Sequence, residues 1–377
     1  MRIFLIIFLT FFALPIYATS NQYIIIIDAG SSSSRAHVFE YVSAMPMVPV
    51  PVIKDIFSQS TKPALASFVN NPQNAGASLQ SILTASAVFL KSQGVNLSQV
   101  PVRLLATAGM RLLTPAQQRA IYQNVRAYIH SNYSFSLNDQ DVQTITGVME
   151  GIYDWLDVNY LSNNFLYPPV TVGTIDMGGA STQIAFVTSD TSKPQNEIAI
   201  TLNNTRYNVF SQSFLGLGQD QALAAIQSNP ATAGCYPQGY VYSQGTGNFN
   251  FSTCSAVYFS LIQSFQVAQN ILPLNGQNFI AFASIYFNYS FFDILATPTQ
   301  TALDTQIHAV CYQTWAHLQT EYNNPFLSTY CANGVYFDAL LYGTYQLQDS
   351  QLTVVNAING NSIDWTLGSL LYSLVKS

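Results

Sequence analysis

Two segments far apart in the chain share a residue pattern that could bind phosphate. Residues 23–35 and 173–183 each begin with apolar strand-type residues, reach an aspartate, turn through glycine and hydroxyl residues, and return to strand-type residues. Such turns let backbone N–H groups approach a phosphate chain closely, and hydroxyls add short donors. The candidate phosphate-binding residues of the two turns are Gly30, Ser31, Ser32, Arg35, Gly178, Gly179, Ala180 and Ser181.

The aspartate at the end of each apolar run indicates a metal ion. A carboxylate beside a polyphosphate is repulsive unless a divalent cation lies between them, so Asp28 and Asp176 predict Mg²⁺ or Ca²⁺, held through water as hard cations often are. One such turn alone would more often be an ordinary turn. Two copies of the same pattern favour a shared phosphate site.

Glu150 is the candidate catalytic base. It lies in an otherwise uncharged stretch, residues 147–153. Burying an unpaired carboxylate there costs free energy, which favours a functional role for it. A general base hydrogen-bonds the attacking water and typically contributes about 10²- to 10⁴-fold in rate. The structural alternative is a helix N-terminal carboxylate stabilised by the helix dipole. Gln183, just after the second turn, is a candidate for holding the same water.

The elements around these residues alternate between strands and helices. Apolar residues at helical spacing predict a helix over residues 75–91, and residues 102–106 read as a short buried strand. Thr114 and Pro115 are typical of a helix N-terminus, so a helix should run from there toward His130. His37 falls on a strand pattern and is expected to be structural rather than a phosphate carrier.

Four blocks of the sequence resemble those of one enzyme family. Residues 28–32, 106–113, 150–161 and 176–183 are similar, in order and in separation, to the motifs of the apyrases, the nucleoside triphosphate diphosphohydrolases. More broadly, the two turns resemble the phosphate-binding hairpins of the actin, hexokinase and heat-shock-chaperone superfamily. The resemblance implies an α/β protein of two RNase H-like, actin-like domains with an active-site cleft between them.

The same resemblance implies roles for individual residues. The family's catalytic glutamate falls on Glu150, and Ser181 and Gln183 would act beside it. Rings from two later regions of the family clamp the nucleotide base, which indicates Tyr286, Phe287, Tyr342 and Tyr345. An arginine that is common in the family is replaced here by Gln219. Further phosphate-binding positions implied by the second block are Thr107, Ala108, Gly109 and Arg111.

The expected function is hydrolysis of nucleoside tri- and diphosphates. Water activated by Glu150 would attack in line, without a phosphoenzyme, and a divalent cation would assist. Alternatives are a kinase of the same superfamily, a polyphosphate phosphatase, or a non-catalytic nucleotide-binding assembly protein. Charged residues make up only 8% of the chain, whose net charge is −6, so a nucleic-acid partner is not expected.

The ends of the chain and its cysteines suggest export. Residues 1–18 have the basic start, the apolar run and the small final residue of a signal peptide, so a soluble, secreted or periplasmic monomer is expected. The predicted domains are residues 20–150 with 350–377, and residues 151–349. After a signal peptide, disulfides are expected, and proximity suggests Cys235–Cys254 and Cys311–Cys331, although four cysteines permit three pairings.

Overall fold

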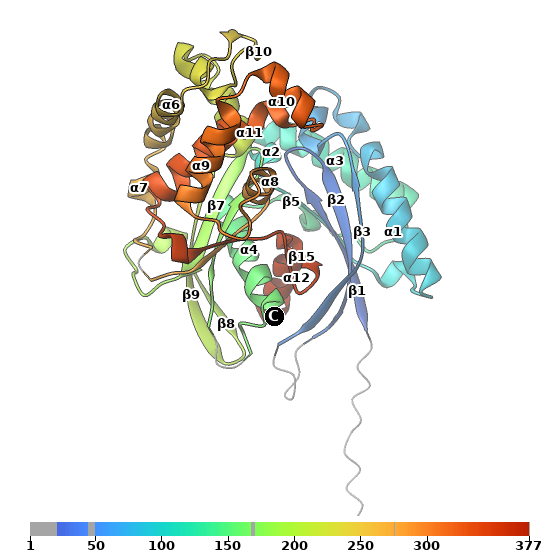
Figure 1. Cartoon of the computed structure of the whole chain (residues 1–377). Coiled ribbons are helices and arrows are strands. Elements are labelled where there is room, and N and C mark those ends of the chain that lie inside the picture. The colour runs from blue at the N-terminus through green and yellow to red at the C-terminus, as the bar shows by residue number, and fades with distance from the viewer. Residues whose placement is uncertain (1–20, 44–49, 167–169, 275, 377) are drawn as a thin grey trace, which may run out of the picture.

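The computed structural model describes residues 21–43, 50–166, 170–274 and 276–376. It contains two sheets, each covered by helices on its outer face, with two further helices between them (Figure 1). The signal-peptide prediction concerns residues outside this range. Within it, no helix is both long enough and apolar enough to cross a bilayer.

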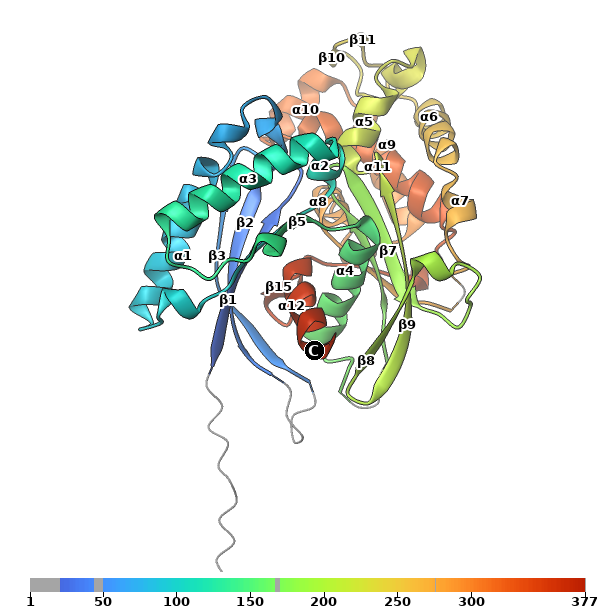
Figure 2. The ribbon, with the colours of Figure 1, turned by 180° about the vertical axis from the view of Figure 1, so that it is seen from behind.

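The first sheet is built on an antiparallel hairpin that continues into parallel strands. Its order is β3-β2-β1-β4-β5, with β1, β2 and β3 antiparallel and β1, β4 and β5 parallel. Helices α1 (Gln80–Ser92) and α3 (Pro115–Asn132) cover its outer face (Figure 2). The strands are β1 (Gln22–Ala29), β2 (Ser34–Val42), β3 (Val52–Thr61), β4 (Val102–Ala106) and β5 (Val142–Thr144).

The helices of this unit begin where local signals place them. Thr114 caps α3 by accepting a hydrogen bond from the Gln117 amide, and Pro115 is its first residue, as predicted. Helix α1 begins at Gln80, later than the predicted residue 75, because residues 77–79 form a separate 3-10 turn. Between them, β4 has the predicted bounds, and the short α2 (Ala108–Arg111) follows it.

The second sheet repeats this plan. Its order is β13-β12-β6-β7-β9-β8, in which β6 and β7 form the antiparallel hairpin and β6, β12 and β13 run parallel. β13 therefore extends the second sheet, so the chain returns to the first unit only after residue 354, not at residue 350. The strands are β6 (Gly173–Met177), β7 (Ser181–Val187), β8 (Glu197–Leu202), β9 (Thr205–Leu215), β12 (Phe279–Ala281) and β13 (Leu352–Val354).

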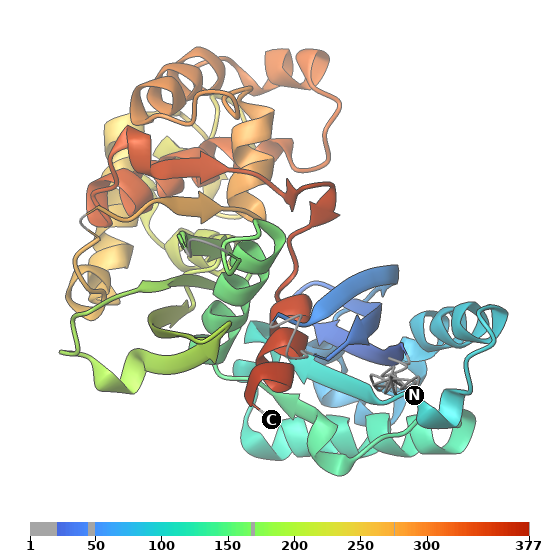
Figure 3. The same cartoon turned by 90° about the horizontal axis from the view of Figure 1, so that it is seen from below.

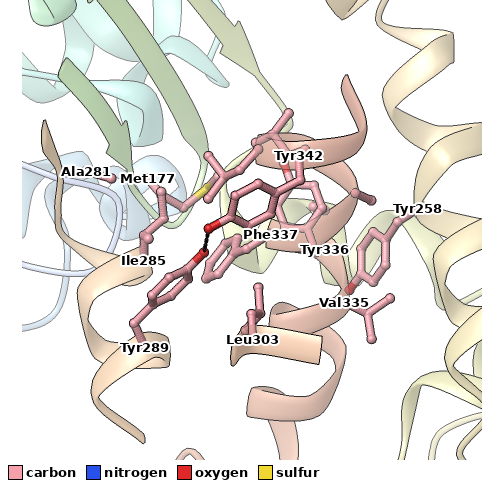
Figure 4. Packing of buried hydrophobic residues seen from close by; sticks show 14 of the residues in the cluster. Met177, Tyr258, Ala281, Ile285, Tyr289, Leu303, Val335, Tyr336, Phe337 and Tyr342 are labelled. Carbon is pink, nitrogen blue, oxygen red and sulfur yellow. Dashed lines mark hydrogen bonds between the residues drawn. The ribbon is translucent and has the colours of Figure 1, made fainter. Parts of the chain in front are cut away.

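Helices rich in aromatic residues cover the second sheet. They pack around one apolar core that includes Tyr258, Tyr336 and Phe337 (Figure 4). Disulfides Cys235–Cys254 and Cys311–Cys331 join neighbouring helical segments, which is the pairing expected from proximity. The helices are α5 (Gln219–Ile226), α6 (Phe251–Ser264), α7 (Val267–Asn270), α8 (Ser284–Phe291), α9 (Gln300–Cys311), α10 (Trp315–Glu321) and α11 (Leu327–Phe337), which continues into a π-helical turn, Asp338–Thr344.

Helices α4 (Gly147–Leu161) and α12 (Trp365–Lys376) lie between the two sheets (Figures 1 and 3). A third apolar cluster contains residues of both sheets and of both helices, so the two units share a core. α12 packs closely on α4 at Gly368, where a Cβ atom would collide with the carbonyl oxygen of Tyr153. Small hairpins β14 (Ala357–Ile358) and β15 (Asn361–Ser362) precede α12, and β10 (Val241–Tyr242) pairs with β11 (Gly245–Thr246).

Candidate active site

The two glycine-containing turns face one cavity between the sheets. Its volume is about 490 Å³, and Asp28 and Asp176 both line it. A Cβ atom on Gly179 would lie 2.9 Å from Oγ of Ser31, so the two turns nearly touch across the cavity. Other residues lining it are Gly30, Ser32, Ser33, Arg35, Thr107, Glu150, Asp154, Gly178, Phe282, Ser284, Phe287, Asn356, Asp364 and Trp365.

The turns are equivalent in backbone geometry. The amide of Gly30 donates to the Ser33 carbonyl at 3.0 Å, and the amide of Gly178 donates to the Ser181 carbonyl at the same distance. In the antiparallel register of the first hairpin, Asp28 lies opposite Arg35, and in that of the second hairpin, Asp176 lies opposite Gln183. Each hairpin therefore places one carboxylate and one polar side chain at the rim of its sheet.

Glu150 is held in place by residues from two other elements, α2 and β7. It lies in the first turn of α4, 5% exposed, and its Oε2 accepts hydrogen bonds from Nη2 of Arg111 at 2.5 Å and from Nε2 of Gln183 at 3.0 Å. The same Arg111 and Gln183 nitrogens also donate to Oγ of Ser181, at 3.0 and 2.8 Å. The predicted catalytic residues Glu150, Ser181 and Gln183 thus form one network, which Arg111 joins.

The network around Glu150 is buried, and two of its polar atoms have no partner among the described residues. Burial raises the pKa of Glu150, and the guanidinium of Arg111 partly offsets this by favouring the carboxylate. Oε1 of Gln183 and Nε of Arg111 are buried without a hydrogen-bond partner among the described residues. One acceptor and one donor of the network are therefore left unsatisfied by the described residues.

The two strand-end aspartates fit a hard divalent cation. Oδ1 of Asp28 is buried without a partner among the described residues, and an all-oxygen donor set suits Mg²⁺ or Ca²⁺. Burial and then the neighbouring carboxylates raise the pKa of Asp28, and burial and Glu150 raise that of Asp176 to about 8, in the absence of any positive charge between them. Within the described residues, no three acidic, histidine or cysteine side chains are arranged to ligate a metal directly.

A buried ion triad ties the first hairpin to the C-terminal segment. Nδ1 of His37 lies 2.6 Å from Asp55, and its Nε2 lies 3.0 Å from Oδ2 of Asp364. Burial alone would lower the pKa of His37, but the two carboxylates outweigh burial and raise it to about 10. Arg35 lies 3.9 Å from the same oxygen of Asp364 with its side chain half exposed. His37 therefore has a structural position, as expected.

Comparison with known proteins identifies the family. Residues 16–377 match the model of the GDA1/CD39 (nucleoside phosphatase) family. The chain belongs to this family. Its relatives include probable apyrase 3 of Arabidopsis thaliana, which is 28% identical over 94% of this chain and 83% of its own length. Human ectonucleoside triphosphate diphosphohydrolase 8 is also 28% identical, over 94% of this chain and 82% of its own.

Solved structures support the fold. A nucleoside triphosphate hydrolase from Neospora caninum superimposes with a TM-score of 0.71 at 17% identity, covering 95% of this chain and 93% of its own. A Ppx/GppA protein from Aquifex aeolicus gives 0.59 at 13% identity, covering 95% and 99%. The predictions of the apyrase family, of an enzyme of this class and of two actin-like domains are confirmed.

The block from Thr107 to Arg111 contributes unequally to the cavity of this GDA1/CD39 protein. Thr107 lines the cavity, and Arg111 reaches Glu150. Gly109 lies behind the first turn, where a Cβ atom would come within 3.0 Å of the Ser31 Cα. Ala108 is buried in the first turn of α2. The absence of a side chain at Gly109 therefore leaves room for the turn that Ser31 occupies.

The four predicted base-binding rings do not line the cavity together. Phe287, on α8, lines the cavity and is 59% exposed, with the half-buried Tyr286 packed edge-on at 5.5 Å between ring centroids. Tyr342 and Tyr345 are 7% and 3% exposed in the core of the second unit. The Tyr342 hydroxyl bonds to that of Tyr289 at 3.3 Å (Figure 4). Of the four predicted rings, Phe287 is therefore the one that lines the cavity.

Gln219 has a structural contact in this member of the family. It begins α5 beside the second turn, where its amide donates to the Gly178 carbonyl at 2.9 Å. Its side-chain Oε1 accepts a hydrogen bond from Asn333 at 3.0 Å. An uncharged side chain at this position therefore joins α5 to α11 and brings no positive charge to the second turn.

Two acidic residues at the cavity were not anticipated from the sequence. Asp154 follows Glu150 by four residues, so helical spacing could have placed both on one face. Asp364 comes from the far end of the chain, and no local pattern connects it with His37 or Arg35. Burial raises the pKa of Asp154 well above normal, and Asp176 and Glu150 raise it further.

Proposed function

We propose that this chain is an exported, divalent-cation-dependent hydrolase that removes terminal phosphates from nucleoside tri- and diphosphates, with Glu150 as the general base. The observation that carries the proposal is the position of Glu150. It lies on a cavity lined by both phosphate-type turns, with one carboxylate oxygen fixed by Arg111 and Gln183.

The turns supply the phosphate-binding groups. Backbone N–H groups near Gly30 and Gly178, with the hydroxyls of Ser31 and Ser32, bind phosphate oxygens from the two sides of the cavity. Arg111 contributes its free Nε–H and its charge. The chain has few basic residues after Arg126. Arg111 and the backbone N–H groups of the turns therefore supply most of the positive charge that the protein itself offers to the phosphates.

Asp28 and Asp176 would hold the cation through water. A cation held there would supply positive charge to the phosphate oxygens and so favour attack. The two aspartates come from equivalent strand ends on opposite hairpins and line the same cavity, so both can face the same phosphate chain. Oδ1 of Asp28 is buried without a partner among the described residues, and burial beside Glu150 disfavours the charged form of both aspartates, so a positive charge would stabilise them.

Glu150 and Gln183 would position the attacking water. Both hydrogen bonds described for the Glu150 side chain end on Oε2, which leaves Oε1 for water, and the free Oε1 of Gln183 is a second acceptor. Glu150 takes the proton as the water oxygen attacks phosphorus in line with the leaving phosphate. Ser181 accepts hydrogen bonds from both Arg111 and Gln183. It therefore links Gln183, which would hold the water, to Arg111, which would bind phosphate.

Phe287 would stack on the nucleotide base. Its exposed ring lies on the same cavity as the two turns, and stacking tolerates any base because every base has a flat face. We therefore expect broad base specificity. Export is consistent with two disulfides, since such bonds persist in oxidising compartments.

A panel of substrates with matched variants tests the proposal. Purified wild-type protein should release phosphate from ATP and ADP, but not from AMP, with Mg²⁺ or Ca²⁺ and without any acceptor. Glu150→Gln should keep nucleotide binding and lose about 10²- to 10⁴-fold in kcat, whereas Glu321→Gln, at an exposed site on α10, should change nothing. Hydrolysis of polyphosphate in preference to nucleotides, or near-normal turnover by Glu150→Gln, contradicts the proposal.

A further inference from the structure

Asp154 is a buried carboxylate on the active-site cavity to which the reaction outlined above gives no task. It lies one helical turn beyond Glu150 on α4 and lines the same cavity. Its side chain is 1% exposed, and neither carboxylate oxygen has a hydrogen-bond partner among the described residues. An ionised group in such a position is costly unless a charge of opposite sign approaches it.

Neighbouring carboxylates show how unusual this isolation is. Glu150 has Arg111 and Gln183 as partners. Asp364 lies beside His37 and accepts hydrogen bonds from Thr366. These groups are thus compensated by the protein, whereas Asp154 is not.

The positively charged side chains near the cavity already have other carboxylates as partners. Among the described lining residues, the cationic side chain is Arg35, which is half exposed and lies closest to Asp364. Arg111 bonds to Glu150 and Ser181. An ionised Asp154 would therefore take its compensating charge from outside the chain, in the space that Asp28 and Asp176 also line.

We propose that Asp154 is a third carboxylate of the divalent-cation site, acting with Asp28 and Asp176 through the water shell of the ion. This inference rests on the proposed function only for the existence of the cation site. Two acidic strand ends need the nucleotide's phosphates to complete a strong site, whereas a third carboxylate raises the negative charge enough to bind the ion before substrate arrives. The protein should therefore bind a divalent cation when no nucleotide is present.

The test is calorimetric titration of the nucleotide-free protein with MnCl₂. Wild-type protein should bind one Mn²⁺ per chain, and Asp154→Asn should weaken that binding about 10-fold or more, as loss of an outer-shell partner does in other metal sites. The matched control is Asp157→Asn. Asp157 is equally buried on the same helix and has one unpartnered oxygen, but it does not line the cavity and accepts a hydrogen bond from the Asp364 amide at 2.8 Å.

Thermal melting adds a readout that distinguishes a cation-binding role from a structural one. Without cation, Asp154→Asn should melt no lower than wild type because it removes an unpaired buried charge, and Mn²⁺ should raise its melting temperature less. Unchanged Mn²⁺ affinity in Asp154→Asn, equal weakening in Asp157→Asn, or absence of Mn²⁺ binding to the wild type would each overturn the inference. Phosphate release from ATP by the same wild-type preparation shows separately whether the proposed hydrolysis stands.

Discussion

The two phosphate-type hairpins have the same backbone frame but different side-chain surroundings. Arg35 in the first hairpin and Gln183 in the second stand opposite equivalent aspartates. Arg35 is half exposed beside Asp364, and its neighbour His37 joins the C-terminal segment. Gln183 is 1% exposed and binds Glu150. One duplicated frame thus joins the C-terminal segment on one side and, in the proposed mechanism, serves attack by water on the other.

The largest difference should appear when the two equivalent positions are truncated alike. Gln183→Leu removes both the donor to Glu150 and the water acceptor, so kcat should fall about 10³-fold. Arg35→Leu removes a partly screened cation and should cost less than about 10-fold, mainly in KM. Steady-state kinetics with ATP measures both. Equal losses in kcat would mean that the hairpins share one chemical role.

The next effect concerns the charge beside Glu150. Arg111→Gln should lower kcat/KM about 10²-fold and move the acidic limb of its pH profile to higher pH. The direction follows because Arg111 lowers the pKa of Glu150, so its loss lets burial raise that pKa further. Arg119→Gln, at an exposed position on α3, is the control. If the acidic limb does not move, Glu150 is not the group whose ionisation sets it.

A smaller effect is expected at the base. Phe287→Ala should raise KM about 10-fold with kcat nearly unchanged, since stacking is worth about 1 to 3 kcal/mol per base and acts equally in the ground and transition states. Phe326→Ala removes another exposed ring, 62% exposed and away from the cavity, and should have no effect. If KM for ATP is the same in both variants, the base does not rest on Phe287.

The smallest effect on turnover, and one chiefly on stability, should come from His37→Gln. The folded pKa of His37, about 10, lies above its unfolded value of about 6.5, so its ion pairs stabilise the protein fully below pH 6.5 and lose that effect as pH rises through 10. The gap in melting temperature between wild type and His37→Gln should therefore be widest near pH 6 and narrow toward pH 10. A gap that does not depend on pH would assign His37 a packing role only.

The parts of the site that could be predicted from the sequence are those whose residues lie close together in it. Each turn carries its aspartate, glycine and hydroxyls within a few residues, and Glu150 stands out because its stretch is otherwise uncharged. The pairing of Cys235 with Cys254 followed from proximity, and the structure has it. In each case a short segment contains the whole signal, so the fold adds only the position.

The remaining parts depend on contacts between distant segments. Asp364 meets His37 only because α12 returns to the first sheet, and nothing near either residue indicates this. Tyr342 and Tyr345 resembled base-binding rings in a ring-rich stretch, yet the π-helical turn directs them into the core. Aromatic residues in a core and aromatic residues at a cleft occur in equally ring-rich stretches of sequence. Exposure alone distinguishes them, and exposure requires the fold.

The most direct test of the account is a crystal structure with a non-hydrolysable ATP analogue and Mg²⁺. The account predicts that the terminal phosphates lie between the turns of Ser31 and Gly179, with Glu150 facing the terminal phosphorus across a water molecule. Its base should lie against Phe287. A nucleotide bound instead in the larger cavity beside Lys54 and Asn163, with the two turns empty, would contradict the account.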